Sequence, residues 1–333
     1  MRGFVLTRYG GPTAAELREV AVPGPGPGEL QIAVKAAGLN PVDFKIREGQ
    51  LRVVQSYALP IVMGCELSGV VTSIGAGVQR FRAGDLVYTR VAKDRLGAFA
   101  ETACVHEDLV AKKPASLDFV HAAGAPLAAL TALQGLRDEL LVKPGMRIFI
   151  PGGAGGVGTF AIQLARHFGA SVATTASTRG RSLVERLGAD VIVDYTSENF
   201  VKVLRDYDGA FDLVGGTTLA RAFSVVRRGG AVVSIAGLPE PTTAMKDMGG
   251  SIGLAVLFWF LSAPIRLRAL MAGVRYRYLF MHPSARDLET IGALVDAKKL
   301  EVVVDRVFPF AEIREAFAYL EQGRAKGKVV VTM

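Results

Sequence analysis

The chain has 333 residues, half of them hydrophobic and 21% charged, which excludes an intrinsically disordered protein. Its length predicts two domains or one large α/β unit. Only two cysteines are present, which excludes a disulfide scaffold and a four-cysteine zinc site and favours a reducing compartment. The net charge of +8 is modest for this size and identifies no partner by itself. No secretory signal pattern opens the sequence, so we expect a cytoplasmic protein.

The first part of the chain, up to about residue 115, has the pattern of short strands. Val, Ile and Gly recur in alternating runs such as Leu30–Ala36, Leu67–Ile74 and Asp85–Val91. Turn-forming sequences separate these runs, for example the Pro-Gly repeats of residues 23–28. We therefore expect a mostly antiparallel β region.

From Asp118 onward, helical and strand patterns alternate. His121–Leu136 has helical periodicity, and an apolar strand at Met146–Pro151 leads into a glycine cluster and an amphipathic helix ending at His167. The same alternation continues, with predicted strands at Ser171–Thr175, Val191–Val193, Phe211–Val214 and Ala231–Ile235 and a predicted helix at Arg181–Leu187. Strands that alternate with helices predict a parallel sheet, so the fold class is α/β.

Another change of pattern follows Pro283. The remaining chain predicts a helix, a strand, a helix and a final strand, at Arg286–Lys298, Val302–Phe308, Ala311–Gln322 and Lys328–Thr332. The β-rich part therefore surrounds an inserted α/β part in the sequence. We place the inserted part at residues 123–283.

The glycine cluster contains the pattern G-x-G-x-x-G at Gly153, Gly155 and Gly158. It follows a predicted strand and opens a predicted helix, which is the context that dinucleotide binding requires. Glycines let the backbone approach a pyrophosphate, and the free N–H groups of the helix N-terminus face the anion. A glycine-rich turn without a ligand is the alternative interpretation.

The end of the second strand of this part indicates which dinucleotide binds. NAD sites usually carry an acidic residue there, about 20 residues after the glycines, for the ribose 2′-OH. Here no acid is found, and the strand is followed by hydroxyls and cations: Ser177, Thr178, Arg179 and Arg181. These groups would bind a 2′-phosphate that a carboxylate would repel. The sequence therefore favours NADP(H). The alternative, that one of the two arginines belongs to a solvated loop, leaves this preference unchanged.

Further motifs extend along nearly the whole chain, at Ala36–Asp43, Gly64–Val71, Gly75–Val78, Ala83–Val87, Gly97–Glu101, Leu130–Ala132, Leu187–Asp190, Asp194–Tyr195, Gly229–Gly237 and Gly323–Val330. With the glycine cluster, they resemble the zinc-independent branch of the medium-chain dehydrogenase/reductase superfamily, the quinone oxidoreductase-like proteins. The motifs are highly specific for the superfamily, less so for the branch, and poorly specific for the substrate.

The resemblance implies two domains with the active site in the cleft between them. A GroES-like β domain for substrate and catalysis would comprise residues 1–122 and 284–333, and a Rossmann NADP-binding domain would comprise residues 123–283. It also implies a homodimer formed through an edge strand of the Rossmann sheet, near Tyr276–Met281.

Site residues follow from the same resemblance. The pyrophosphate would lie on the loop of Gly153, Gly155, Gly156, Val157 and Gly158, and the adenosine phosphate among Ser177, Arg181 and Tyr195. Ala236 and Gly237 would lie near the nicotinamide with Thr131, and the catalytic candidates are Thr131, Asn40, Asp43 and Lys45. For Asp43, and likewise for Glu66, a structural hydrogen-bond acceptor is an equal alternative.

The positions that hold zinc in related dehydrogenases carry other residues here. Asn40 stands at the first ligand position, Cys65 at the histidine position, and no cysteine occurs near Gly124–Thr131. Cys65, Glu66 and Asp43 could in principle supply three ligands, but a small packed Cys65 is the simpler interpretation. We expect no metal.

Without a Lewis acid, oxidation of an alcohol is difficult, whereas hydride transfer to an activated acceptor is easier. We therefore predict an NADPH-dependent oxidoreductase that reduces a small hydrophobic quinone or α,β-unsaturated carbonyl. An enoyl-thioester reductase or an NADP-dependent alcohol dehydrogenase of the same fold is one alternative. An NADPH-binding protein that acts at a membrane or on RNA is another, but no RNA-binding aromatic motif is present, so we expect no nucleic-acid partner.

Residues 239–275 form an insert that departs from the family pattern. Its stretch Gly249–Ile265 has no charge, and Met248–Arg286 has five arginines but no acid. The run is short for a membrane span and contains Gly and Pro, so we do not expect it to cross a bilayer. We favour a helix that packs over the cleft or against the dimer partner. An interfacial membrane element, or arginines that meet an anionic thioester tail, are the alternatives.

Overall fold

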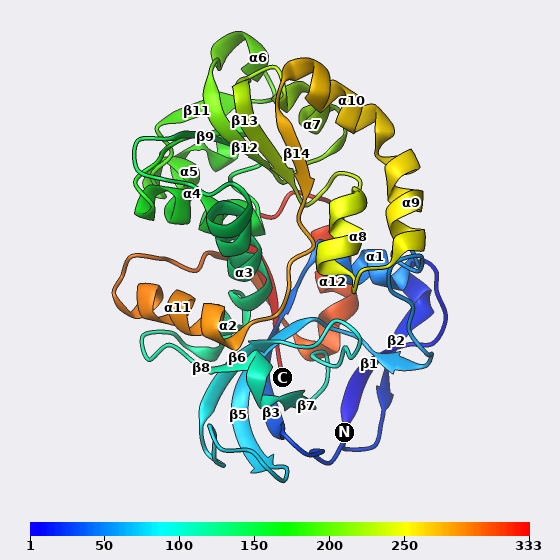
Figure 1. Cartoon of the computed structure of the whole chain (residues 1–333). Coiled ribbons are helices and arrows are strands. Elements are labelled where there is room, and N and C mark those ends of the chain that lie inside the picture. Colours follow the sequence, from blue (N-terminus) through cyan, green and yellow to red (C-terminus); the bar gives the residue numbers. More distant parts are fainter. The chain divides into compact units, whose positions relative to one another are not determined.

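The computed structural model describes all residues, Met1–Met333, and divides into two compact units. One unit comprises Met1–Leu130 and Pro283–Met333, and the other comprises Thr131–His282. The first and last parts of the chain thus fold together, and the middle part folds as a body of its own (Figure 1).

The first unit is built on antiparallel sheet. Its larger sheet has the order β15-β16-β3-β5-β6-β8, with β7 also paired to β3, and a smaller sheet has the order β2-β1-β4. The strands are β1 (Arg2–Leu6), β2 (Ala15–Glu19), β3 (Glu29–Leu39), β4 (Ile61–Val62), β5 (Glu66–Ile74), β6 (Leu86–Arg90), β7 (Thr102–His106), β8 (Val110–Lys112), β15 (Val304–Pro309) and β16 (Lys328–Thr332). Only β15 and β16 pair in parallel.

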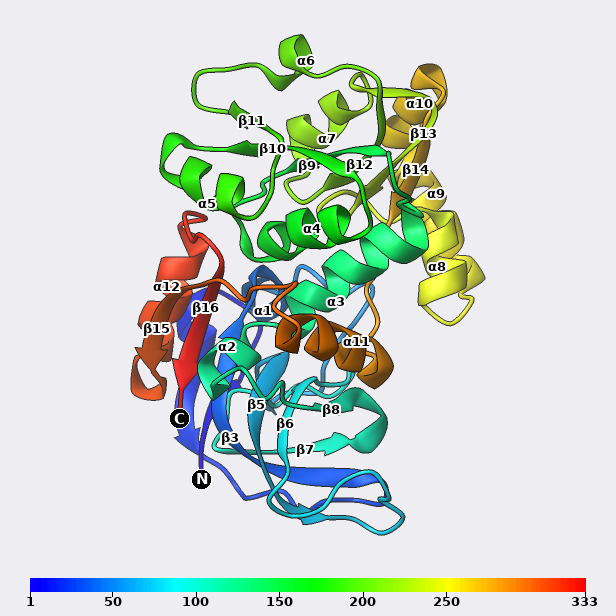
Figure 2. The same cartoon turned by 90° about the vertical axis from the view of Figure 1, so that its left-hand side faces the viewer.

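Alternating residues of β3 explain why this strand is central. Leu30, Ile32 and Val34 are buried in the core, as a two-residue period requires. The final strand, β16, pairs antiparallel with β3, with Val329 opposite Leu39. Figure 2 shows these two strands side by side, although they lie at opposite ends of the sequence. The C-terminal segment therefore completes the sheet that the N-terminal segment begins.

Short helices complete the first unit. They are α1 (Pro41–Arg47), α2 (Phe119–Ala123), α11 (Ala285–Asp296) and α12 (Ile313–Glu321), with 3₁₀ turns at Pro12–Ala14, Glu107–Leu109 and Phe310–Glu312. Phe317 of α12 stacks on Phe4 with ring centroids 5.6 Å apart. Helix α3 (Pro126–Gln134) crosses from the first unit into the second, and a π-helical turn (Gly135–Glu139) follows it.

The helix expected at His121–Leu136 is therefore divided. Helix α2 ends at Ala123, and α3 starts at Pro126. Proline fits the first turn of a helix, where its missing N–H has no partner to lose, but it cannot continue a preceding helix. The proline explains the break.

The second unit is a six-stranded parallel sheet with the order β11-β10-β9-β12-β13-β14. Its elements are β9 (Arg147–Pro151), α4 (Gly156–His167), β10 (Ser171–Ala176), a 3₁₀ turn (Thr178–Gly180), α5 (Arg181–Arg186), β11 (Val191–Asp194), α6 (Phe200–Val203), β12 (Tyr207–Asp212), α7 (Gly216–Ala222), β13 (Val226–Ser234) and β14 (Arg275–Tyr278). The order reverses between β9 and β12, and in such sheets this is where ligands bind, at the carboxyl ends of the strands. The predicted α/β fold class, with a parallel sheet in the middle part of the chain, is confirmed.

Aromatic packing fills the core beneath this sheet. The ring of Phe149 lies 5.0 Å from that of Phe200 and 6.4 Å from that of Tyr207, centroid to centroid. Tyr207 begins β12, so this strand starts before the predicted Phe211–Val214 and ends at Asp212. Asp212 ends the strand because its buried carboxylate accepts a hydrogen bond from the N–H of Gly215, which turns the chain.

The insert forms three helices before β14: α8 (Pro241–Asp247), α9 (Ile252–Leu261) and α10 (Ala263–Ala272). The axes of α9 and α10 differ by 66°. The bend lies at Ser262, whose hydroxyl donates to the carbonyl of Phe258, and Pro264 follows in the first turn of α10. No single helix of the protein is long and apolar enough to cross a membrane; α9 and α10 reach that length and composition only as a bent pair.

A buried arginine ties α8 to the edge of the sheet. The guanidinium of Arg277 in β14 donates to Glu240 at 2.9 Å, to Asp247 at 2.6 Å and to Glu139 at 3.1 Å. The three carboxylates neutralise the buried guanidinium, and their hydrogen bonds fix its orientation. Arg275 also donates, to the carbonyl of Glu139 at 2.7 Å, so two of the five arginines of Met248–Arg286 are held at the edge of the sheet.

Candidate active site

The glycine loop lies between β9 and α4, at the carboxyl end of the parallel sheet. A Cβ on Gly158 would lie 2.4 Å from the carbonyl oxygen of Gly152, so only glycine lets the helix approach the turn this closely. A Cβ on Gly155 would meet only the carbonyl oxygen of Gly152, at 3.4 Å. The loop is therefore tight on the side of the helix and open at Gly155.

The N-terminus of α4 presents backbone N–H groups at the end of the glycine loop. Gly155 is the residue before the helix, Gly156 and Val157 begin it, and the first turn contains no acidic side chain. The first N–H groups of a helix have no acceptor within the helix, and the helix dipole adds positive potential there. Gly153, Gly155, Gly156, Val157 and Gly158 form one loop, which we call the cradle. The N–H groups of Gly153 and Gly155 donate within the fold, to the carbonyls of Thr175 at 3.2 Å and Gly152 at 3.1 Å, so the donors at the helix start are those of Gly156, Val157 and Gly158.

The candidates for the adenosine phosphate come from two neighbouring strands. Ala176 of β10 pairs with Asp194 of β11, so Ser177 and Tyr195 each follow a paired residue. Arg181 begins α5 and is exposed, and Tyr195 is 62% exposed. The structure brings these candidates to one edge of the sheet, next to the glycine loop: a Cβ on Gly180 would lie 3.0 Å from that of Ala154.

Asp194 is a carboxylate beside this group that the sequence analysis assigned no role. Hydrogen bonds from the hydroxyl groups of Thr178 and Thr196 hold the pKa of Asp194 at about 2, so it is ionised near neutral pH. Its Oδ2 accepts from the hydroxyl of Thr178 at 2.6 Å, and its Oδ1 from that of Thr196 at 2.7 Å. These donors occupy the carboxylate, whereas Arg181 is exposed.

Ala236 and Gly237 lie just beyond β13. Their N–H groups donate to the hydroxyl oxygen of Ser234 at 3.1 and 2.8 Å, and that hydroxyl donates to Asp212 at 2.7 Å. Burial raises the pKa of Asp212. A Cβ on Gly237 would lie 2.5 Å from the hydroxyl oxygen of Tyr276, so a side chain has no room there. This network fixes the backbone after β12 and β13 at the carboxyl end of the sheet.

In the first unit, a buried polar cluster surrounds the start of α1. The side-chain amide of Asn40 donates to Glu66 at 2.7 Å, and the ammonium of Lys328 donates to the same carboxylate oxygen at 2.7 Å. Lys328 also donates to the side-chain oxygen of Asn40, and the other oxygen of Glu66 accepts from the N–H of Leu127 at 2.6 Å. Lys328 is a member that the sequence analysis missed; its only signal was a charged residue opening an otherwise apolar strand.

Asp43 completes this cluster from the first turn of α1. Its Oδ2 accepts from the backbone N–H of Asn40 at 2.8 Å, which closes a capping box, while Oδ1 has no hydrogen-bond partner. Asp43 is only 1% exposed. Burial raises its pKa from 3.8 to about 6, although the Cys65 thiol and the Asn40 N–H act in the opposite direction.

Two catalytic candidates lie outside this cluster. Lys45 follows Asp43 by two positions on α1 and is half-buried, and residues so spaced do not share a helix face. Thr131 is buried on α3, in the second unit. The structure therefore joins Asn40 and Asp43, with Glu66 and Lys328, but not Lys45 or Thr131.

The residues at the zinc-ligand positions have other contacts. Glu66 is engaged by Lys328 and Asn40, and the fully buried Cys65 lies beside Asp43, which raises the pKa of the thiol together with burial. No group of three His, Cys, Asp or Glu side chains is placed to hold a metal ion.

The sequence of this chain is similar to those of known proteins. The family model described as the alcohol dehydrogenase GroES-like domain matches residues 26–115, and the one described as zinc-binding dehydrogenase matches residues 187–331. The chain is 38% identical to the chloroplastic NADPH-dependent alkenal/one oxidoreductase of Arabidopsis thaliana, over 99% of its own length and 79% of that protein. The chain belongs to the quinone oxidoreductase-like family of the medium-chain dehydrogenases/reductases. The family predicted from the motifs is confirmed.

Two more members of the family are similar over the whole chain. The 2-methylene-furan-3-one reductase of Solanum lycopersicum is 36% identical, over 99% of this chain and 79% of that protein. The structure of the quinone oxidoreductase from Coxiella burnetii superposes with a TM-score of 0.86 at 30% identity, over 100% of this chain and 99% of that one. All three relatives are oxidoreductases by name, and two are named reductases or oxidoreductases of unsaturated carbonyl compounds.

The raised pKa of Asp43 predicts a pH-dependent stability. Because the folded state holds this proton more tightly, the stabilisation is complete below pH 3.8 and is lost as the pH rises through about 6. Asp43→Asn keeps an acceptor for the Asn40 N–H but cannot ionise. We expect it to remove a fall of roughly 3 kcal/mol in the free energy of unfolding over this range, measured by urea denaturation at several pH values.

Asp94→Asn is the matched control for this experiment, since Asp94 is exposed. It should keep the pH profile of the unsubstituted protein. Equal pH profiles for Asp43→Asn and the unsubstituted protein would show that Asp43 ionises normally despite its burial.

Proposed function

We propose that this protein transfers hydride from NADPH to a small α,β-unsaturated carbonyl compound or quinone. The observation that carries the proposal is the pairing of the cradle at the N-terminus of α4 with the half-buried hydroxyl of Ser177 and the exposed guanidinium of Arg181. The similarity to an NADPH-dependent alkenal/one oxidoreductase and to a quinone oxidoreductase supports both the cofactor and the substrate classes.

In this proposal residues 123–283 bind the cofactor, which supplies the hydride when bound. The backbone N–H groups of the cradle hold the pyrophosphate, and Ser177, Arg181 and Tyr195 hold the adenosine phosphate. Ala236 and Gly237 border the nicotinamide together with Thr131. Their backbone is held by the Ser234 hydroxyl, so this edge of the site is rigid before any ligand arrives.

Residues 1–122 and 284–333 form the substrate and catalytic domain in this proposal. Hydride addition to an enone or quinone places negative charge on oxygen, which needs a donor or a nearby cation. Lys45 is half-buried and can supply that charge. Asn40 and Asp43 act as positioning residues, because their buried hydrogen bonds hold the start of α1, which carries Lys45.

Both cysteines are unpaired, which supports a reducing compartment, and we place the protein in the cytoplasm.

Turnover assays with purified protein test the activity. We expect NADPH oxidation with 9,10-phenanthrenequinone or a simple enone, unchanged by a chelator and slower with NADH. Gly155→Ala is the matched variant, because its Cβ fits the fold but enters the open side of the cradle; it should weaken NADPH binding without changing thermal stability. Tight NADPH binding without turnover of either acceptor would overturn the substrate class. Turnover of enoyl-CoA alone, or of an alcohol with NADP⁺, would identify one of the two other reactions.

Replacement of Arg181 tests the cofactor preference. Arg181→Ser removes a charge-assisted hydrogen bond to the 2′-phosphate, so the KM for NADPH should rise roughly tenfold to hundredfold. The KM for NADH should stay unchanged, because NADH has no phosphate at that position. Arg205→Ser, at another exposed arginine of the same unit, is the control. An equal effect on both cofactors would contradict the assignment of Arg181.

We also propose that the protein is a homodimer formed through β14. This strand is at the edge of the sheet, with β13 as its only strand partner, and such an edge can pair with a copy of itself. Sedimentation velocity at micromolar concentration should give twice the 35.3 kDa of one chain, with slow hydrogen exchange at Arg275–Tyr278. A monomer with fast exchange in this strand would contradict the proposal.

A further inference from the structure

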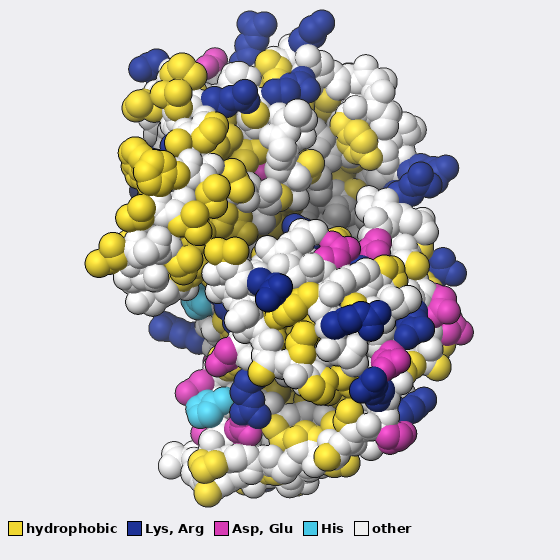
Figure 3. Space-filling view, turned by 90° about the vertical axis from the view of Figure 1, so that its right-hand side faces the viewer, with side chains coloured by type: hydrophobic (Ala, Val, Ile, Leu, Met, Phe, Trp, Pro, Cys, Tyr) yellow, Lys and Arg dark blue, Asp and Glu magenta, His cyan; other side chains and the backbone are white.

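The insert exposes apolar side chains that the chain itself does not cover. Ile252 is 74% exposed, Phe260 65% and Leu270 75%. With Val256, Leu267 and Met271, which are also more than half exposed, they form what we call the apolar patch of α9 and α10. Figure 3 shows hydrophobic side chains gathered on this side of the molecule. In α9 only Phe258 is buried, so the chain by itself does not cover the apolar residues of this helix.

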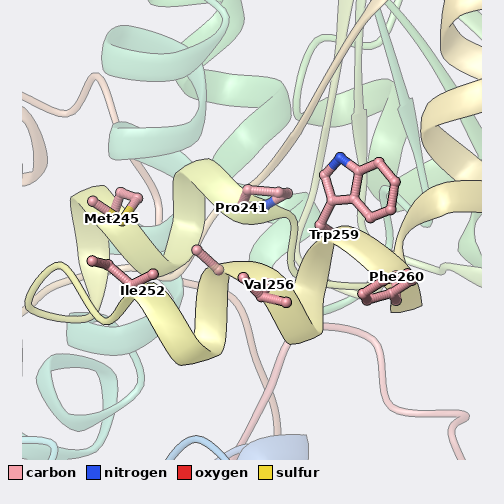
Figure 4. A pocket seen from close by; sticks show the side chains of 7 residues that line it. Pro241, Met245, Ile252, Val256, Trp259 and Phe260 are labelled. Carbon is pink, nitrogen blue, oxygen red and sulfur yellow. The ribbon is translucent and has the colours of Figure 1, made fainter.

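A groove lined only by apolar side chains adjoins the patch. Its volume is about 400 Å³, and it lies between α8 and α9, with Pro241 and Met245 on one side and Ile252, Val256, Trp259 and Phe260 on the other (Figure 4). Protein surfaces rarely leave such a region open to water, because contiguous apolar surface is costly to hydrate. We therefore expect an apolar group to fill this groove.

Positive charge flanks this apolar surface. Met248–Arg286 contains no acidic residue, and of its arginines Arg275 and Arg277 have partners in the sheet region. The two on α10 differ: Arg268 is exposed, and Arg266 lies over the ring of the half-exposed Trp259, 5.7 Å from its centroid. Neither has a carboxylate partner within the segment. An apolar face bordered by arginine and tryptophan matches a bilayer surface, where acyl chains lie below and anionic headgroups above.

A second copy of the chain fits this surface less well. A two-fold interface would bring the arginines of one patch toward the same patch of the other copy. Because the segment has no carboxylate, these charges would gain no partner while losing water. An anionic lipid surface supplies the opposite charge and also conforms to an irregular apolar shape.

We propose that α9 and α10 dock on the surface of a bilayer that contains anionic phospholipid. The patch inserts among the acyl chains, the groove between α8 and α9 receives one of them, and Arg266 and Arg268 contact headgroup phosphates. The bend of 66° is compatible with this placement, since two helix axes that meet define a plane, and that plane can lie parallel to the membrane.

Vesicle flotation of the full-length protein tests the proposal. Vesicles of phosphatidylcholine with about 30% phosphatidylserine should carry the protein at low salt, whereas pure phosphatidylcholine should carry much less. Arg266→Gln with Arg268→Gln should weaken binding by roughly twenty-fivefold, because each arginine near an anionic surface contributes about a factor of five. Ile252→Gln with Phe260→Gln should weaken it by roughly tenfold or more, through lost apolar insertion.

Val22→Gln with Ile74→Gln is the matched control, because both side chains are exposed and apolar but lie outside the patch. It should leave flotation unchanged, and circular dichroism and thermal unfolding should show that every variant is folded. Absence of flotation at low salt would overturn the proposal, as would flotation that the patch variants do not change. If the patch variants instead halve the sedimenting mass and no vesicle is bound, the occupant is a second copy. None of these readouts depends on turnover, so the activity and the docking can fail independently.

Discussion

The buried ion pair between Lys328 and Glu66 is the interaction on which the first unit depends. It joins residues 262 positions apart in the sequence, at a nitrogen–oxygen distance of 2.7 Å and with almost no exposure of either side chain. Removing one partner of such a pair leaves an uncompensated buried charge, which typically costs about 3–5 kcal/mol. The pair therefore demands that the last strand of the chain lie against the strands of the N-terminal half.

The consequences of that pair reach the candidate catalytic residues. Glu66 also accepts from the Asn40 amide, and Asn40 caps α1 with the help of Asp43. The start of α1 is thus held by a network that joins its own residues Asn40 and Asp43 to Glu66 of β5 and Lys328 of β16. A low-dielectric environment strengthens each of these bonds and penalises any member left unpaired, so the network behaves as one unit. Asp43, with one oxygen lacking a partner, is its weakest point, and its proton is the one that neutral pH can remove.

The second unit differs, because what it arranges is a set of backbone donors at one edge of a parallel sheet. Close approach of α4 to the turn after β9 requires glycine at position 158, and the loop after β13 is held by the Ser234 hydroxyl. Both devices are made of backbone geometry rather than reactive side chains. This suits a protein whose chemistry resides in a cofactor and whose own task is to orient it. The apolar insert has no part in orienting the cofactor. Docking on a bilayer would place the enzyme where an apolar substrate that partitions into the membrane is concentrated.

The sequence by itself determined the fold class, the glycine cradle and the family, because these depend on local patterns: periodicity, a G-x-G-x-x-G after a strand, and motifs of fixed spacing. It also marked Asn40, Asp43 and Glu66 as candidates, but not their partners or their burial. Only the tertiary structure decided those, since Lys328 reaches Glu66 through strand pairing across most of the chain, and burial of Asp43 depends on that packing. The exposure of Ile252, Phe260 and Leu270 was likewise beyond the sequence. An apolar run indicates that burial of its side chains is favourable. Whether they are buried depends on whether the rest of the folded chain offers surface to cover them.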